Sequence, residues 1–148
     1  THGEYIVDAN GEVMLIEIAN RGGGVLTAPV ILPAIAEVDL PELLIRNSFG
    51  EFPEPQGVKP APQDRAAVLS FLDFGITGLL TGLDGLEEAL QIPGVLAIHT
   101  FAKVGQRIPV ITNGPSRHGF IIAAADSRDG ARALVAQARR TLHVETEP

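Results

Sequence analysis

Apolar side chains occupy both faces of a predicted β-hairpin at the start of the chain. Asn10-Gly11, the preferred sequence of a two-residue hairpin turn, separates two strand-like runs. Neither run alternates between apolar and polar positions, a pattern typical of strands that are covered on both sides. We therefore expect the hairpin to be buried on both faces. The apolar positions are Tyr5, Ile6, Val7, Val13, Met14, Leu15, Ile16 and Ile18.

The length of the turn decides which residues of the hairpin face each other. With Asn10-Gly11 as the complete turn, Ala9 pairs with Glu12, and Glu4 lies directly opposite Glu17. A three-residue loop with a glycine bulge would place the two glutamates on opposite faces instead. Hairpin preferences favour the two-residue turn, and we adopt it as the prediction.

Two glutamates that face each other across a strand pair require an explanation. Like charges directly opposite each other destabilise a β-ladder, and buried acids need partners. A divalent cation between Glu4 and Glu17 would turn the repulsion into an attraction, and hard cations prefer carboxylate oxygens. The alternative is a solvated hairpin with scattered acids. The apolar flanks favour the first interpretation, a metal site.

Helical spacing replaces the strand pattern after the hairpin. Apolar residues at helical intervals predict a helix over 27–37, which Pro33 should bend. A second helix is predicted to start at Asp39, where Asp39-Leu-Pro-Glu42 resembles a capping box, and to stop at Gly50. The hairpin and these helices form the first predicted unit, residues 1–52.

The second half of the chain is rich in short strands. Helices are predicted from Asp84 to Pro93 and after Ser127, whose side chain can cap a helix start. Strands and helices mix without regular βαβ repetition, so we predict an α+β fold with a small β-rich module at 65–148. We expect 108–112 to run back beside 95–101. The predicted strands are 66–71, 76–81, 95–101, 108–112, 119–125 and 143–147.

A proline-rich stretch and a change in charge predict a boundary between these two parts. Residues 1–64 carry ten acids and three bases, whereas residues 65–148 carry eight of each. The stretch 52–62 contains four prolines, which favours an extended linker. We therefore predict a linker at 53–64.

The composition excludes several classes of function. The chain has no cysteine, so disulfides, thiolate zinc sites and cysteine nucleophiles are excluded. A net charge of −7 argues against nonspecific nucleic-acid binding. No apolar run approaches the roughly 18 residues of a membrane span, and no secretory signal opens the chain. These features fit a cytoplasmic protein without a nucleic-acid or membrane partner.

The hairpin resembles the last active-site hairpin of the ATP-grasp superfamily. The matching residues are Glu4-Tyr-Ile-Val-Asp8, Leu15-Ile-Glu17-Ile and Arg21 with the glycines after it. The superfamily includes carboxylate–amine ligases, biotin carboxylase, carbamoyl phosphate synthetase and two purine-pathway enzymes. Arg117-His-Gly-Phe-Ile-Ile122 resembles a strand of the small C-terminal module of these enzymes. The chain is thereby identified as the C-terminal portion of an ATP-grasp enzyme.

This resemblance implies roles for four residues. In the superfamily, two acids hold the Mg²⁺ ions that bridge the phosphates of ATP, and an arginine contacts the phosphate or acyl-phosphate. These positions match Glu4, Glu17 and Arg21. An asparagine commonly stands two residues after the second acid, but this chain has Ala19 there, so Asn20 is the candidate third metal ligand. The implied cofactors are ATP and Mg²⁺ or Mn²⁺.

The implied function is that of a ligase that forms an acyl-phosphate from a carboxylate and transfers it to an amine. Both substrates are expected to be small molecules. The superfamily's ATP-clamping elements precede this hairpin, so we expect the isolated chain to be an inactive C-terminal fragment. Two alternatives stay open. The chain can be a noncatalytic binding or assembly module that keeps the hairpin for structure, or a fragment of an ATP-grasp carboxylase.

The same hairpin predicts self-association. A hairpin that is apolar on both faces needs cover, and an unpaired strand edge invites pairing. We expect a homo-oligomer formed through residues 1–40, with Tyr5, Val7, Met14 and Ile16 against a second copy. The alternative is a monomer in which the C-terminal module covers the hairpin.

The remaining polar residues give weaker indications. The four histidines have no metal-ligand spacing, so each is expected on the surface or as a satisfied core residue; His2 is of interest because it lies beside Glu4. Ser116-Arg117-His118 is expected to form a polar turn rather than an anion site. The last helix is expected to present a solvated face with Arg132, Arg139 and Arg140.

Overall fold

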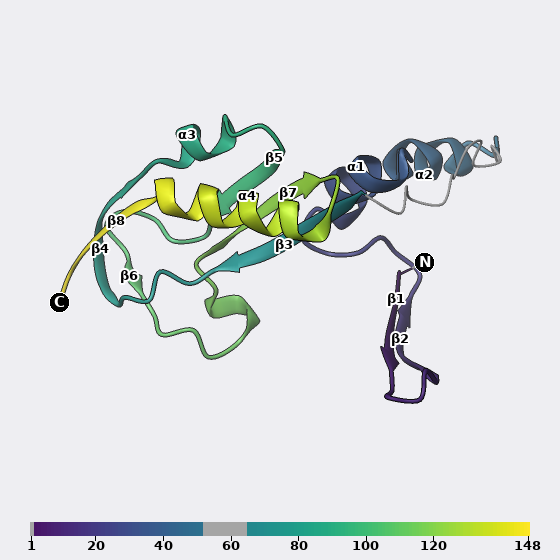
Figure 1. The fold of residues 1–148 in the computed structure, drawn as a ribbon, viewed down its shortest axis with the longest axis horizontal. Helices are drawn as coiled ribbons and strands as arrows, with labels where there is room; N and C mark the ends of the chain where they lie inside the picture. Colours follow the sequence, from purple (N-terminus) through teal and green to yellow (C-terminus); the bar gives the residue numbers. More distant parts are fainter. Residues whose placement is uncertain (1, 52–64) are drawn as a thin grey trace. The chain divides into compact units, whose positions relative to one another are not determined.

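The computed structural model describes residues 2–51 and 65–148. The chain divides into two compact units, Thr1–Lys59 and Pro60–Pro148, which are described separately (Figure 1). The predicted linker at 53–64 lies outside the described residues, so the boundaries of the two predicted domains stay predictions. No helix in the described part of the chain is long and apolar enough to cross a membrane.

The first unit begins with an antiparallel hairpin whose loop has three residues. Strand β1 (His2–Val7) pairs with β2 (Val13–Ala19), and Val7 lies opposite Val13. The N–H of Asp8 donates to the carbonyl of Glu12 at 3.0 Å, and Gly11 has a φ of +87°. The predicted two-residue turn, with Ala9 opposite Glu12, is therefore wrong.

The side chain of Asp8 explains why the longer loop forms. Its Oδ1 accepts the N–H of Asn10 at 2.8 Å and the N–H of Glu12 at 2.9 Å. An aspartate that bonds to the backbone two residues ahead stabilises its own turn, in competition with the turn that Asn-Gly prefers. Gly11 then takes the left-handed position, which a glycine adopts without strain.

Acidification should loosen this turn as Asp8 becomes protonated. Hydrogen bonds from the N–H of Glu12 and then that of Asn10 to the ionised carboxylate lower the pKa of Asp8 from its ordinary value of 3.8. Because the pKa of Asp8 is lower in the folded state, its ionised carboxylate stabilises the folded turn at any pH above the unfolded pKa. This stabilisation disappears as the pH falls through the folded pKa. In an NMR titration below pH 3.8, the amide signals of Asn10 and Glu12 should move together with the Asp8 carboxyl. The same movement in an Asp8→Asn variant would contradict this assignment.

A second irregularity brings the two glutamates back into register. Tyr5 lies opposite Leu15, but Glu4 lies opposite Glu17, so Ile16 is an extra residue in β2. Such a β-bulge shifts the pairing by one residue. The loop and the bulge shift the register in compensating ways, and the predicted pairing of Glu4 with Glu17 is confirmed.

The hairpin is exposed on both faces, contrary to the prediction that both are buried. Its apolar side chains, from Tyr5 to Ile18, are 50–63% exposed. The helices of the first unit do not provide the expected cover, because they pack against one another: η1 contacts both α1 and α2. The apolar runs therefore form a surface rather than a core.

The predicted helices of the first unit are confirmed, with one refinement. The segment predicted as one bent helix is a π-helical turn, η1 (Thr27–Ile31), continued by α1 (Leu32–Ala36). Helix α2 (Leu40–Ser48) starts as predicted, because the carboxylate of Asp39 accepts the N–H of Glu42. It ends just before Gly50, whose φ is +78°.

Residues 65–148 of the second unit form two three-stranded antiparallel sheets. In the first, β7 (Gly119–Ala125) lies between β3 (Ala66–Leu72) and β5 (Val95–Thr100). In the second, β4 (Gly78–Asp84) lies between β6 (Arg107–Ile108) and β8 (His143–Glu147). The α+β fold class is therefore confirmed.

Two helices cover one face of the first sheet. The longer, α4 (Arg128–Thr141), packs along β7 and β3, and the shorter, α3 (Leu86–Leu90), packs against β5 and α4 (Figure 1). As predicted, α4 starts at Ser127, whose side chain accepts the N–H of Gly130. The buried core between helices and sheet consists of Leu72, Ala89, Val95, Ile121, Ala123, Val135 and Ala138.

The predicted strand 108–112 is mostly wrong. Only Arg107–Ile108 is a strand, and it pairs with β4 rather than with β5. Pro109 has no N–H to donate, so the strand cannot continue in a ladder beyond Ile108. Two backbone hydrogen bonds hold the preceding turn. The N–H of Gly105 donates to the carbonyl of Leu80 at 2.8 Å, and the N–H of Leu80 donates to the carbonyl of Gln106 at 2.9 Å.

Candidate functional site

The hairpin places two acids and two basic side chains together at its open end. Glu4 and Glu17 lie directly opposite each other, and residues in such a pair share one face of a hairpin. His2 Nε2 lies 3.5 Å from Glu4 Oε1, and Arg21 Nη2 lies 3.9 Å from Glu17 Oε1. Both carboxylates are 59% exposed, so solvent and a ligand can reach them.

The glycines after Arg21 have different roles in the structure. A Cβ on Gly23 would lie 2.9 Å from Cβ of Thr27 and 3.0 Å from Nδ1 of His2, so only glycine lets η1 and the His2 ring approach this closely. A Cβ on Gly24 would meet no atom within 4 Å. Packing therefore explains the glycine at position 23, whereas no contact with another described residue requires a glycine at position 24.

The donor set of the hairpin fits a magnesium ion that takes its other ligands from elsewhere. No group of three histidine, cysteine or acidic side chains within 2–51 and 65–148 could hold a metal. Two carboxylates nevertheless match Mg²⁺, which keeps several waters and binds substrate phosphates. Asn20 follows the end of β2, and its exposed amide makes no hydrogen bond to another described residue.

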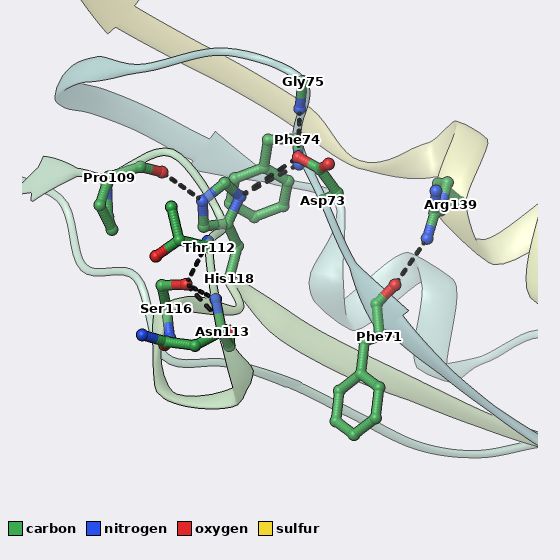
Figure 2. A network of polar contacts seen from close by, with 10 residues as sticks. All are labelled: Phe71, Asp73, Phe74, Gly75, Pro109, Thr112, Asn113, Ser116, His118 and Arg139. Atoms are coloured by element: carbon green, nitrogen blue, oxygen red, sulfur yellow. Dashed lines mark hydrogen bonds and ion pairs between the residues drawn. The ribbon is translucent and has the colours of Figure 1, made fainter.

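In the second unit, a buried histidine connects three segments (Figure 2). His118 is 3% exposed; its Nδ1 lies 3.1 Å from the N–H of Phe74, and its Nε2 lies 3.0 Å from the carbonyl oxygen of Pro109. Nδ1 must accept and Nε2 must donate, so the hydrogen bonds define the neutral Nε2–H tautomer. Asp73 Oδ1, 3.9 Å from Nδ1, accepts the N–H of Gly75 instead. His118 is thus a satisfied core histidine, as expected.

The neighbouring Ser116 and Arg117 also have structural partners. Ser116 forms a reciprocal capping box with Asn113 around a 3₁₀ turn, η2 (Gly114–Ser116). The guanidinium carbon of Arg117 lies 3.6 Å from the ring centroid of Phe71, a cation–π arrangement. The expectation of a polar turn is confirmed.

Replacing His118 by glutamine should destabilise the second unit. A glutamine amide cannot reach Phe74 and Pro109 at once, so one buried backbone group loses its partner, at a cost of about 1–3 kcal/mol. His143→Gln is the matched control, because His143 is exposed. Urea unfolding followed by circular dichroism should show a lower midpoint for His118→Gln alone. Equal midpoints for the two variants would show that the His118 contacts contribute nothing to stability.

The sequence interpretation missed the contribution of Asp8 to the candidate site. The aspartate sets the three-residue loop, and this loop and the bulge at Ile16 together place Glu17 opposite Glu4. The available signal was the spacing in Asp8-Ala-Asn-Gly, since an aspartate two residues before an asparagine can form an Asx turn.

Known structures share the fold of this chain. The chain is similar to an L-amino acid ligase from Bacillus licheniformis, with a TM-score of 0.78 and 22% identity over 99% of this chain and 37% of that one. It is similar to phosphoribosylglycinamide synthetase from Anaerococcus prevotii, with a TM-score of 0.78 and 15% identity over 98% of this chain and 36% of that one. It is also similar to N5-carboxyaminoimidazole ribonucleotide synthetase from Thermotoga maritima, with a TM-score of 0.56 and 24% identity over 98% of this chain and 36% of that one. The fold is that of the C-terminal portion of ATP-grasp ligases.

The sequence then identifies the family. Residues 70–147 match the family described as L-amino acid ligase C-terminal domain 2, and the chain belongs to this family. It is also 28% identical over 122 residues to the uncharacterized protein y4rH of Sinorhizobium fredii, which covers 81% of this chain and 24% of that protein. The chain therefore spans about a quarter to two fifths of the length of these relatives. The predicted relation to the ATP-grasp enzymes is confirmed.

Proposed function

We propose that this chain is the C-terminal part of an ATP-dependent, magnesium-requiring ligase that joins a carboxylate to an amine through an acyl-phosphate. The observation that carries the proposal is the register of the hairpin, which sets Glu4 opposite Glu17 despite two irregularities. Membership of the L-amino acid ligase C-terminal family and the fold of ATP-grasp ligases support it.

In this proposal Glu4 and Glu17 hold Mg²⁺ or Mn²⁺, with Asn20 as a third candidate ligand. When bound, the metal neutralises negative charge on the phosphates of ATP. The strand pairing holds the backbones of Glu4 and Glu17 opposite each other before a ligand arrives. His2 is close enough to orient the carboxylate of Glu4.

Arg21 is proposed to contact the phosphate or the acyl-phosphate. Its planar guanidinium can donate two parallel hydrogen bonds to such a group. In the structure, Nη2 lies near Glu17 and Nη1 donates to the carbonyl of Gly22 at 3.0 Å. These two contacts place the guanidinium beside Glu17, next to the proposed metal ligands.

The test is product formation by the full-length protein that carries this segment. Purified enzyme with ATP and Mg²⁺ should release phosphate only when both an amino-acid carboxylate and an amine are supplied, and mass spectrometry should detect the amide. The isolated chain of 148 residues should show neither activity and only weak ATP binding. Carboxylation of an acceptor with bicarbonate would favour the carboxylase alternative, and the absence of any ATP turnover would favour a noncatalytic module.

We further predict that the isolated chain associates with itself through residues 1–40. Exposed apolar patches of this kind mark interaction surfaces, and Tyr5, Val7, Met14 and Ile16 are 51–63% exposed. Light scattering at micromolar concentration should give a mass above 15.6 kDa, and Met14→Glu should reduce it. A monomer of wild-type chain would rule out this assembly.

A further inference from the structure

Strand β3 is an edge strand with outward-facing backbone groups. It pairs only with β7 among the described strands. The carbonyl of Leu72 accepts the N–H of His118 on the β7 side, and backbone groups alternate in direction along a strand. The N–H and carbonyl groups of Ala67, Leu69 and Phe71 therefore point to the open edge. The bond from Arg139 Nη2 to the Phe71 carbonyl, 2.9 Å long, agrees with this direction (Figure 2).

A groove lies between this edge strand and α4. Its volume is about 330 Å³, and both apolar and polar side chains line it. The helix contributes two arginines to its wall. The lining residues are Val68, Ser70, Arg132, Val135, Ala136 and Arg139.

The charge of the groove is uncompensated. Arg132 and Arg139 are both exposed, and neither forms an ion pair with an acid in the described part of the chain. Helix α4 carries four arginines but only one acid, Asp129. The groove therefore combines apolar contact and positive charge with the outward backbone groups of Ala67 and Leu69, which form no hydrogen bond to another described residue.

We propose that β3 binds an extended, acidic segment of a partner protein as an additional strand. Main-chain hydrogen bonds to Ala67 and Leu69 would supply affinity, and acidic side chains meeting Arg132 and Arg139 would supply specificity. A second copy fits this edge poorly. Two-fold pairing of β3 with itself would bring the arginines of both copies together, and like charges oppose such pairing.

The test uses the full chain and three fluorescent hexapeptides. The acidic probe alternates valine and glutamate, the basic probe alternates valine and lysine, and the third is the acidic probe with alternate backbone nitrogens methylated. Only the first should bind. In hydrogen exchange measured by NMR, the amides of Ala67 and Leu69 should become protected on binding, while those of Val68 and Ser70, already bonded to β7, should not change.

Two charge reversals on the same helix provide the matched comparison. Arg132→Glu should weaken binding of the acidic probe about tenfold, because an attraction becomes a repulsion of similar size. Arg140→Glu, which lies outside the groove, should weaken it less than about twofold. Unchanged exchange of Val68 and Ser70 shows that each variant is folded.

Several results would overturn the proposal. Equal binding of the acidic and basic probes, or equal effects of the two charge reversals, would show that Arg132 and Arg139 do not select an acidic partner. Undiminished binding of the methylated probe would show that the peptide does not bind by adding a strand to β3. Loss of self-association in the Arg132→Glu variant would show that a second copy of the chain, rather than a partner protein, binds at the edge of β3.

Discussion

Glu17→Gln in the full-length enzyme should lower kcat by about a hundredfold to a thousandfold, the usual effect of removing one electrostatic contact to the reacting phosphates. Glutamine keeps the size of the side chain but removes the charge that faces Glu4 across the hairpin. Stability should change by less than about 1 kcal/mol, since Glu17 is 59% exposed and its ion pair with Arg21 is long, at 3.9 Å. Steady-state kinetics at saturating ATP and Mg²⁺ measure this effect.

Glu12→Gln is the control for this variant, because Glu12 is an exposed glutamate of the same hairpin, outside the paired acids. It should keep kcat within about twofold of the wild type, as expected for a surface change away from the chemistry. A Glu17→Gln enzyme with normal turnover would leave the noncatalytic module as the better interpretation of the hairpin.

Gly85→Ala should cause a large loss of stability in the second unit. Gly85 has a φ of +87° and precedes α3, and a Cβ at this position would overlap the carbonyl oxygen of Thr141 at the end of α4. Backbone cannot move aside as a flexible side chain can. Left-handed strain and the clash together should cost about 3–4 kcal/mol, measured by urea unfolding.

Gly105→Ala separates the two causes. Gly105 has the same φ of +87°, but a Cβ there would meet no atom within 4 Å. The free energy of unfolding of this variant should fall by about 1 kcal/mol, the cost of the left-handed backbone strain alone. Equal losses at the two positions would show that α3 and α4 can separate to accommodate the methyl group, and that the clash is not the cause.

Local sequence signals predicted the limits of an element correctly where residues at its own ends determine where it begins and ends. Strands β7 and β8 have the predicted limits, 119–125 and 143–147, because polar or turn residues bound each apolar or alternating run. Helix α4 starts where the Ser127 hydroxyl caps it. The position of Asp39 likewise predicted the start of α2.

The errors arose where a distant or competing partner decides the structure. The turn depended on Asp8, whose carboxylate outweighs the preference of Asn10-Gly11 for a shorter loop. The pairing of β6 with β4 joins segments about thirty residues apart, and no local pattern specifies such a partner. The prediction that the hairpin is buried was wrong. Apolar runs show that a strand has surface to bury, but they do not show which other segment buries it.

The pairing of Glu4 with Glu17 at the candidate site was predicted correctly, although the turn on which that prediction rested was wrong. Paired acids and the family resemblance indicated Glu4 and Glu17, and the register places them opposite each other. Three-dimensional neighbours were harder to predict. His118, which connects Phe74 with Pro109, joins segments that are 44 and 9 residues away in the sequence.

The bulge at Ile16 has a consequence for how this hairpin tolerates changes in length. Strand β2 contains one residue more than the ladder requires between Val13 and Glu17, whereas β1 contains none to spare between Glu4 and Val7. Removing one residue from this part of β2 would give a regular ladder and keep the two acids opposite each other. Removing one from β1 would leave two surplus residues on the other strand. Single-residue gaps among related sequences should therefore accumulate in the second strand and be absent from the first.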